Sequence, residues 1–348
     1  MNIFLTGATG FLGGKLIHHL IEDDENHLFV LARNITKAEA LRSTLSPENQ
    51  KRITFIKGDI TAEQCELAEE DLLKLKNNVD MVYHLAALVK FDVELRDELF
   101  QINYEGTKHV LELANQCGAK SFFHISTAYT VGKNEIGREE LYPLDNEWNN
   151  PYEESKAKAE HLVFSYKDEM DVSIFRPAII VGDSKTGEAD SHFTLYGFMR
   201  ALELFKRRAL RKAKGEAQRY RLVASKKGTS NFVPVDYVAD ILALASKKAQ
   251  KNTIYNITNP NPPTNQEVLS MLKDALDFEQ LSVVEDHKQY ELSPEEQQLN
   301  QMIQVFLVYL ETHITFQDEN TQALLRDTNI EHLNMPPETV RMIVEAYK

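Results

Sequence analysis

The chain has 348 residues, of which 43% are hydrophobic and 26% are charged, and its formal net charge at pH 7 is −14. This composition is typical of a globular protein of about two domains, and the negative charge argues against a general nucleic-acid binder. We expect no signal peptide, no transmembrane segment and, with Cys65 and Cys117 as the only two cysteines, neither a disulfide framework nor a metal site. A cytoplasmic protein fits these features.

From the first residue onward, short apolar runs alternate with helical patterns. The predicted strands are residues 3–5, 27–32, 53–57, 81–85, 121–125 and 172–176, and the clearest predicted helices are 12–21, 37–45, 98–116 and 153–167. Alternation of this kind predicts βα units and a parallel sheet. Because such connections are right-handed, we expect an α/β fold with a Rossmann-type doubly wound sheet.

After Pro177 the alternation becomes looser. The pattern predicts a long basic helix over 192–214, short strands at 220–224 and 253–257, a helix over 237–248, and a helical tail from Thr264 onward. We expect a Rossmann domain over 1–185, to which 230–260 returns. Residues 186–229 and 261–348 would form a smaller, mostly helical substrate lobe.

A glycine-rich turn, Thr6–Gly14, follows the first predicted strand and opens the first helix. Gly7 allows the tight turn, Gly10 lets the backbone approach a pyrophosphate, and Gly13 lets helix and strand pack closely. The helix N-terminus supplies amides and partial positive charge. The dinucleotide-binding residues predicted in this turn are Gly7, Thr9, Gly10, Phe11, Leu12 and Gly13.

The end of the second predicted strand indicates which dinucleotide is bound. An acidic residue there would hold the ribose 2′-hydroxyl of NAD, but the strand ends in Ala32-Arg33-Asn34, with Lys37 close behind. Arginine suits a 2′-phosphate through charge-assisted bonds. The sequence therefore favours NADP(H).

Tyr152 and Lys156 stand at i and i+4 on a predicted helix, so both project from one face. Reduction of a carbonyl needs an acid, and tyrosine suits that role when a nearby cation lowers its pKa. The pair Tyr104 and Lys108 has the same spacing. Tyr152 is favoured because its helix follows the fifth strand, where it can reach the carboxyl ends of the strands.

Over nearly its whole length the chain resembles the extended short-chain dehydrogenase/reductase superfamily. The matching segments are TGATGFLGG, GDI at 58–60, HLAA at 84–87, ISTAYTVG at 125–132, YEESK at 152–156 and RPAIIVGD at 176–183. The resemblance implies that Thr127 occupies the position of the usual catalytic Ser or Thr, that Tyr152 is the acid/base and that Lys156 binds the nicotinamide ribose. It also implies a cofactor cleft whose remaining residues are Asp59, Ile60, Ala86, Ala87, Asn103 and Pro177.

Several segments look most like the branch of fatty acyl-CoA reductases and thioester reductase domains. They are the runs at 86–114, 126–129, 181–188 and 232–240. This likeness implies a reductase that transfers hydride from NADPH to the carbonyl of an acyl thioester, giving aldehyde or alcohol.

The segment 200–227 carries eleven Lys or Arg residues and two Glu residues. It could hold the phosphates of coenzyme A, an acidic acyl carrier protein or an anionic membrane surface, and the plain alternative is a solvated helix face. The apolar stretch 302–310 could cover an acyl chain, although core packing or a contact in a homodimer fits it better.

Three other functions remain open. The chain could be a sugar-nucleotide epimerase or dehydratase with tightly held NAD, or a ketone reductase of the hydroxysteroid or flavonoid type. A non-catalytic NADPH-binding regulator on the same fold is the third, because fold does not fix function.

Overall fold

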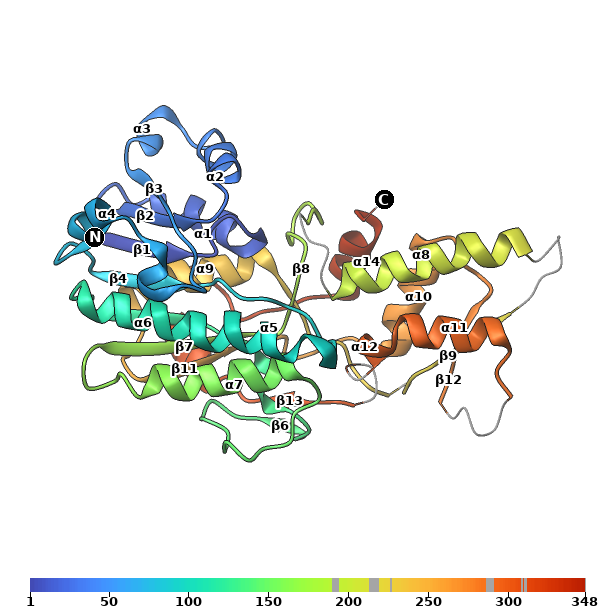
Figure 1. Ribbon diagram of the computed structural model, residues 1–348. Helices are drawn as coiled ribbons and strands as arrows, with labels where there is room; N and C mark the ends of the chain where they lie inside the picture. The colour runs from blue at the N-terminus through green and yellow to red at the C-terminus, as the bar shows by residue number, and fades with distance from the viewer. Residues whose placement is uncertain are drawn as a thin grey trace. The chain divides into compact units, whose positions relative to one another are not determined.

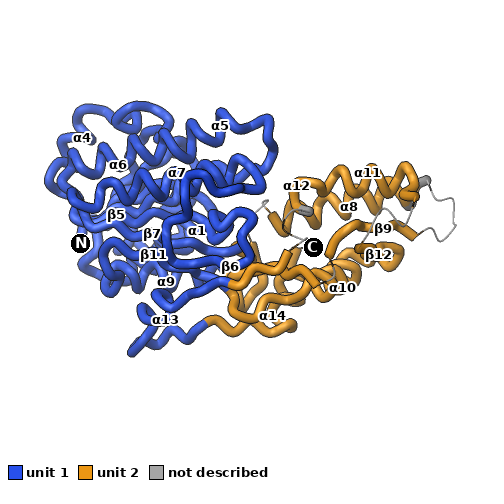
Figure 2. The backbone as a smooth tube through the Cα atoms, turned by 90° about the horizontal axis from the view of Figure 1, so that it is seen from below, with its two compact units in different colours: residues 1–178, 235–258, 316–332 blue, residues 179–234, 259–315, 333–348 orange. Residues whose placement is uncertain are grey.

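The structure is a computed structural model that describes residues 1–189, 194–212, 219–225, 227–285, 291–307, 309 and 312–347. The chain divides into two compact units, coloured separately in Figure 2. The first unit contains 1–178, 235–258 and 316–332, and the second contains 179–234, 259–315 and 333–348. Residues 316–332, predicted for the substrate lobe, therefore lie in the first unit. Residues 179–185, 230–234 and 259–260, predicted for the Rossmann domain, lie in the second unit.

A parallel sheet of seven strands forms the centre of the first unit (Figure 1). Its strands are β1 (Asn2–Thr6), β2 (His27–Ala32), β3 (Ile53–Lys57), β4 (Met81–His84), β5 (Ser121–Ile125), β7 (Asp171–Pro177) and β11 (Thr253–Ile257). They lie in the order β11-β7-β5-β4-β1-β2-β3. The strands are short apolar runs because both faces of the sheet are covered. The predicted doubly wound sheet is confirmed.

Helices cover both faces of this sheet. On one face α1 (Phe11–Ile21) packs against α9 (Val235–Lys248), and on the other α6 (Gly106–Gln116) packs against α7 (Pro151–Phe164). The predicted helix over 98–116 begins earlier, as α5 (Arg96–Phe100), and passes through a π-helical turn at Gln101–Glu105 before α6.

The strand order reverses between β1 and β4, which are neighbours in register from Ile3↔Met81 to Thr6↔His84. In doubly wound sheets the crevice outside the carboxyl ends of the strands, at this switch point, is where ligands bind. The glycine turn after β1 and the loop after β4 therefore meet at the place where a cofactor cleft is expected.

The second unit is mainly helical and contains two small parallel strand pairs. Its helices are α8 (Leu195–Lys212), α10 (Asn265–Ala275), α11 (Pro294–Met302), α12 (Gln304–Leu307) and α14 (Pro337–Glu345). Strand β8 (Ile179–Val181) pairs with β10 (Phe232–Pro234), and β9 (Tyr220–Val223) pairs with β12 (Leu281–Val284). We had predicted only helix in the region of β12. The buried rings of Phe205, Tyr220 and Phe278 contact one another in its core.

The remaining elements are short. They are α2 (Ile35–Arg42), α3 (Pro47–Gln50), α4 (Glu69–Leu75), α13 (Glu319–Leu325), β6 (Ile136–Gly137) and β13 (Thr315–Phe316), together with 3-10 turns at Glu63–Glu66, Val93–Leu95 and Ala128–Val131.

Two predicted segments fall partly outside the described residues: 213–218 and 226 of the basic segment, and 308 and 310 of the apolar stretch. In the described part of that stretch, Ile303 is fully buried and Phe306 packs against Phe198, which is core packing. Nowhere in the described part of the chain is a helix both long and apolar enough to cross a membrane.

Candidate active site

Two glycines of the turn after β1 are required by close backbone contacts. Gly7 has a φ of +72°, and a Cβ placed on it would lie 2.5 Å from the backbone nitrogen of Ala86. A Cβ on Gly13 would lie 2.5 Å from the Cα atom of Ala8. Any side chain at either position would therefore push the turn away from the loop after β4 or push α1 away from β1.

The N-terminus of α1 is open to an anionic ligand. Gly10 is its N-cap residue, no side chain caps the helix and no acidic residue lies in the first turn. By contrast, Asn34 caps α2, Asn150 caps α7 and Thr264 caps α10 through side-chain hydrogen bonds. Because Thr9 and Gly10 are exposed, the free amides of this turn fit the pyrophosphate of a dinucleotide.

Arg33, at the end of β2, is 73% exposed and lies 3.9 Å from the carboxylate of Asp59. Asp59, predicted separately as a residue of the cofactor cleft, is thus the acidic neighbour of Arg33. Since β2 and β3 are parallel and in register at Ala32↔Lys57, the residues that follow the two strands lie side by side. The ion pair is long and exposed, so the guanidinium stays available for another anion.

The other predicted cofactor residues lie around the same strand ends. Ile60 is buried after β3, and Ala86 and Ala87 are half-buried in the loop after β4. The side chain of Asn103, in the π-helical turn, accepts a hydrogen bond from the amide of Leu88 and donates to the carbonyl of that residue. It also donates to the Ser155 hydroxyl at 3.1 Å, and so fixes this loop to α7.

Thr127 and Tyr152 are brought together at the carboxyl end of β5. Thr127 begins the short helical turn after this strand, and its side chain hydrogen bonds to that of Tyr152. Burial raises the pKa of the Tyr152 phenol, and the hydrogen bond from Thr127 opposes this rise. The phenol is therefore neutral at ordinary pH and can act as an acid.

Lys156 is buried one turn further along α7. Its ammonium donates to the Ile125 carbonyl at 2.7 Å and lies 3.3 Å from Nε2 of His124. Burial lowers the pKa of Lys156 to about 8. We had expected Lys156 to lower the pKa of Tyr152, but the net shift of Tyr152 is upward and its opposing partner is Thr127.

Two buried histidines beneath the site were missed by the sequence analysis. His84 bonds to Thr6 at 2.7 Å and to Thr107 at 2.9 Å, and its ring stacks on that of His124 at 5.5 Å between centroids. Burial lowers the pKa of both imidazoles, so both are neutral. The signal was present as a histidine in each of the strands β4 and β5.

The helix that carries Tyr152 and Lys156 is fixed at both ends. Asn150 caps it and Pro151 occupies its first turn, a position suited to proline. Near its other end, Glu160 forms a buried pair with Arg176 of β7, with an Nη2–Oε2 distance of 2.6 Å. Pro177, which follows Arg176, is buried at the end of β7. The fold thus holds the reacting side chains on a rigid helix.

The fold and the site define an oxidoreductase of the extended short-chain dehydrogenase/reductase class. Within that class, residues 5–242 match the model of the NAD-binding family described as Male sterility protein, and the chain belongs to this family. A nicotinamide cofactor follows from this membership.

The chain is similar to fatty acyl-CoA reductase 1 of Homo sapiens, with 30% identity over 222 residues. The match covers 51% of this chain and 43% of that protein, so the chain matches less than half the length of this relative.

Two solved structures are similar to the chain in fold. One is the terminal R domain from the myxalamid PKS-NRPS biosynthetic pathway, with a TM-score of 0.79, 23% identity and coverage of 99% of this chain and 90% of that one. The other is UDP-glucuronic acid 4-epimerase from Bacillus cereus in complex with NAD, with a TM-score of 0.68, 19% identity and coverage of 100% and 96%.

Proposed function

We propose that this protein is an NADPH-dependent reductase of acyl thioesters, acting on an acyl group carried by coenzyme A or by an acyl carrier protein. The observation that carries the proposal is the placement of Thr127, Tyr152 and Lys156 at the carboxyl end of β5, on a chain whose curated relative is a fatty acyl-CoA reductase. A cytoplasmic location stays a prediction.

Thr127 and Tyr152 would hold the carbonyl oxygen of the thioester. Both are hydroxyl donors, and as negative charge develops on that oxygen they stabilise it and Tyr152 supplies the proton. Bound NADPH would supply the hydride, and collapse of the resulting thiohemiacetal would release the aldehyde and the thiol of the carrier. The neutral phenol of Tyr152 suits this acid role because burial keeps its proton in place until an oxyanion forms beside it.

Lys156 would hold the nicotinamide ribose, as the superfamily resemblance implies. Its ammonium already has one fixed acceptor, the Ile125 carbonyl, and a second neighbour in His124. Since an ammonium has three donor protons, one remains for a ribose hydroxyl.

The preference for NADPH over NADH rests on Arg33. Its guanidinium is exposed, and its long contact with Asp59 leaves its donors free for a 2′-phosphate. The open N-terminus of α1 would receive the pyrophosphate.

The proposal is tested by adding NADPH and, separately, acyl-CoA thioesters, aldehydes, ketones and sugar nucleotides to the purified protein. Loss of reduced-nicotinamide absorbance that requires a thioester, with aldehyde or alcohol recovered, would support it. Oxidation with aldehydes or ketones alone would retain the reductase and exclude the thioester. No oxidation, together with NAD released from the denatured protein, would point to an epimerase instead.

A further inference from the structure

Helix α8 of the second unit has one buried face and one exposed cationic face. Met199, Leu202 and Phe205 are buried in the core of this unit. The exposed positions Arg200, Leu204, Arg207 and Arg211 are spaced by four, three and four residues, which places them on one face of the helix.

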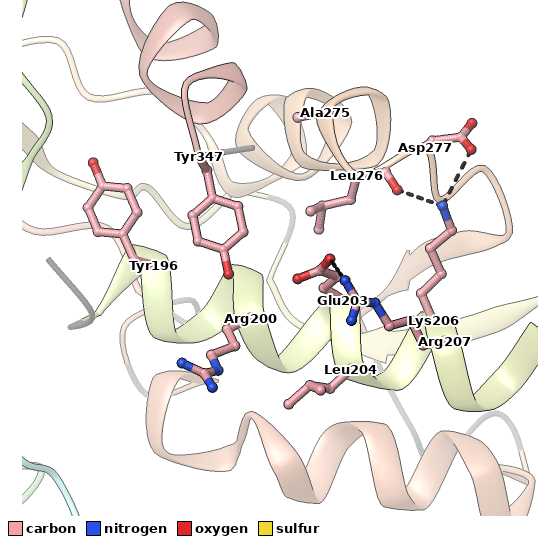
Figure 3. Close-up of a pocket in the computed structure, with 10 residues that line it drawn as sticks. All are labelled: Tyr196, Arg200, Glu203, Leu204, Lys206, Arg207, Ala275, Leu276, Asp277 and Tyr347. Atoms are coloured by element: carbon pink, nitrogen blue, oxygen red, sulfur yellow. Dashed lines mark hydrogen bonds and ion pairs between the residues drawn. The ribbon is translucent and has the colours of Figure 1, made fainter. Parts of the chain in front are cut away.

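A cavity of about 790 Å³ lies along α8, beside the end of α10 and Tyr347 (Figure 3). Binding sites for small molecules are usually about 300–1,000 Å³ in volume. The cavity is therefore large enough for a nucleotide.

The charges that line this cavity do not cancel. Arg207 pairs with Glu203 at 2.5 Å. Lys206 donates to the Leu276 carbonyl at 2.8 Å and lies 3.4 Å from the Asp277 carboxylate. No hydrogen bond or ion pair joins Arg200 to the other lining residues drawn in Figure 3. The lining thus has one surplus cation, which an anionic ligand would neutralise.

The cavity also presents aromatic and apolar surface. The rings of Tyr196 and Tyr347 are stacked, with centroids 6.2 Å apart and an angle of 24° between their planes. Leu204, a lining residue, is 40% exposed. Burial and the Glu203 carboxylate raise the pKa of the Tyr347 phenol, while the nearby cations Arg200 and Arg207 oppose the rise. A planar ring and a negative group would both find complementary surface here.

We propose that this cavity binds the phosphorylated adenosine end of coenzyme A, with Arg200 as the principal phosphate ligand and the tyrosine rings beside the base. The inference rests on the proposed reduction of acyl thioesters and names the part of the substrate that this site recognises. A fatty chain would not suit the cavity, because it would leave the guanidinium of Arg200 against hydrocarbon.

The direct test is calorimetric titration of the full chain with adenosine 3′,5′-bisphosphate, in saturating NADP⁺ so that the cofactor site is filled. We expect binding by the wild type and a loss of about 10-fold or more in affinity for Arg200→Gln, since a hydrogen bond to a charged group contributes about 1.5–3 kcal/mol. Arg208→Gln is the matched control, because Arg208 is exposed on the same helix and does not line the cavity. It should bind within about twofold of the wild type.

A kinetic test uses two thioesters with the same acyl group, one on coenzyme A and one on pantetheine, which lacks the nucleotide. Arg200→Gln should raise KM for the acyl-CoA about 10-fold and leave KM for the acyl-pantetheine unchanged, with kcat unaffected in both cases. A KM that rises equally for both thioesters would overturn the proposal.

These experiments distinguish a failure of the proposed function from a failure of the proposed nucleotide site. If neither thioester is reduced but the bisphosphate binds through Arg200, the site stands and the proposed function falls. If the bisphosphate does not bind, or if Arg200→Gln and Arg208→Gln lower the affinity for it equally, the proposed nucleotide site is wrong, whichever substrate the enzyme reduces. Inhibition of acyl-CoA reduction by an acidic carrier protein, with no binding of the bisphosphate, would also overturn the proposal. It would make this face of α8 a protein-docking surface.

Discussion

The ammonium of Lys156 lies 3.3 Å from Nε2 of His124, in the buried space between α7 and β5. An ammonium is only a donor, so this imidazole nitrogen is the acceptor and the proton of the ring lies on Nδ1. Burial, with Lys156 next in effect, holds the pKa of His124 well below its ordinary value, so the ring stays neutral. His124 is thus a positioning residue for the lysine rather than a proton donor.

Replacement of His124 tests this role. His124→Phe keeps a ring but removes the acceptor, so Lys156 should lose its proton more easily and the alkaline limb of the kcat/KM profile should move to lower pH. His124→Gln places an amide oxygen near the lost nitrogen and should restore the wild-type limb. Identical pH profiles for the two variants, each with wild-type thermal stability, would rule out the positioning role.

Tyr152→Phe removes the proposed acid and leaves the ring in place against Phe91, whose centroid is 5.8 Å away. We expect kcat to fall by about 10²–10⁴-fold, the usual contribution of general acid catalysis. The dissociation constant for NADPH, measured by fluorescence, should change little. Retention of most of the turnover with normal cofactor binding would show that another group supplies the proton.

Arg33 should decide between the two nicotinamide cofactors. Arg33→Ala removes the charge proposed to meet the 2′-phosphate and should lower kcat/KM for NADPH by about 10–100-fold, while kcat/KM for NADH stays within a small factor. The measurement is the ratio of the two specificity constants. A comparable loss with both cofactors would place the role of Arg33 elsewhere.

Gly13 and Gly14 are adjacent in α1 but differ in their surroundings. Gly13→Ala would bring a Cβ to 2.5 Å from the Ala8 Cα atom and from the Gly7 carbonyl oxygen, whereas at Gly14 the nearest atom is a Leu41 methyl at 3.8 Å. We expect Gly13→Ala to lower the free energy of unfolding by about 1–3 kcal/mol. Gly14→Ala should raise it by about 0.5–1 kcal/mol, the helix preference of alanine. Urea denaturation measures both, and equal effects would contradict the close packing at Gly13.

Glu139 should make stability depend on pH. Burial raises its pKa from 4.5 to about 7, although its carboxylate accepts hydrogen bonds from the backbone amides of Asn256 and Asn320 at 2.9 and 2.7 Å. Between these two pKa values the folded protein retains a proton that the unfolded chain has released, so this contribution to stability falls as pH rises through 7. The free energy of unfolding of the wild type relative to Glu139→Gln should therefore decrease from pH 5 to pH 8. A constant difference would show that Glu139 titrates normally.

Most of the sheet could be predicted from the sequence because its strands up to β7 are short apolar runs that alternate with helical patterns. The four-residue strand β12 could not, since Leu281–Val284 is mostly half-buried and pairs in parallel with β9, about sixty residues earlier in the chain. Neither composition nor periodicity indicates that two strands so far apart in the sequence pair with each other.

The candidate active site could also be predicted only in part. Gly7, Gly13, Tyr152 and Lys156 stand in local motifs, and their roles in cofactor binding and catalysis stay predictions. The ion pair between Arg33 and Asp59 and the contact between Lys156 and His124 were not predicted. In each case the two residues lie on different elements of the fold. Such contacts depend on strand order and register, which the motifs do not contain.

Strand β11, at the edge of the large sheet, comes from a part of the chain that follows the first segment of the second unit, residues 179–234. During synthesis on the ribosome, β7 would therefore emerge and wait with one row of its amides and carbonyls unpaired until Thr253–Ile257 is made. A truncated chain ending at Pro177 would keep that open edge permanently and should aggregate. The order in which the segments are made thus sets when the sheet can be completed.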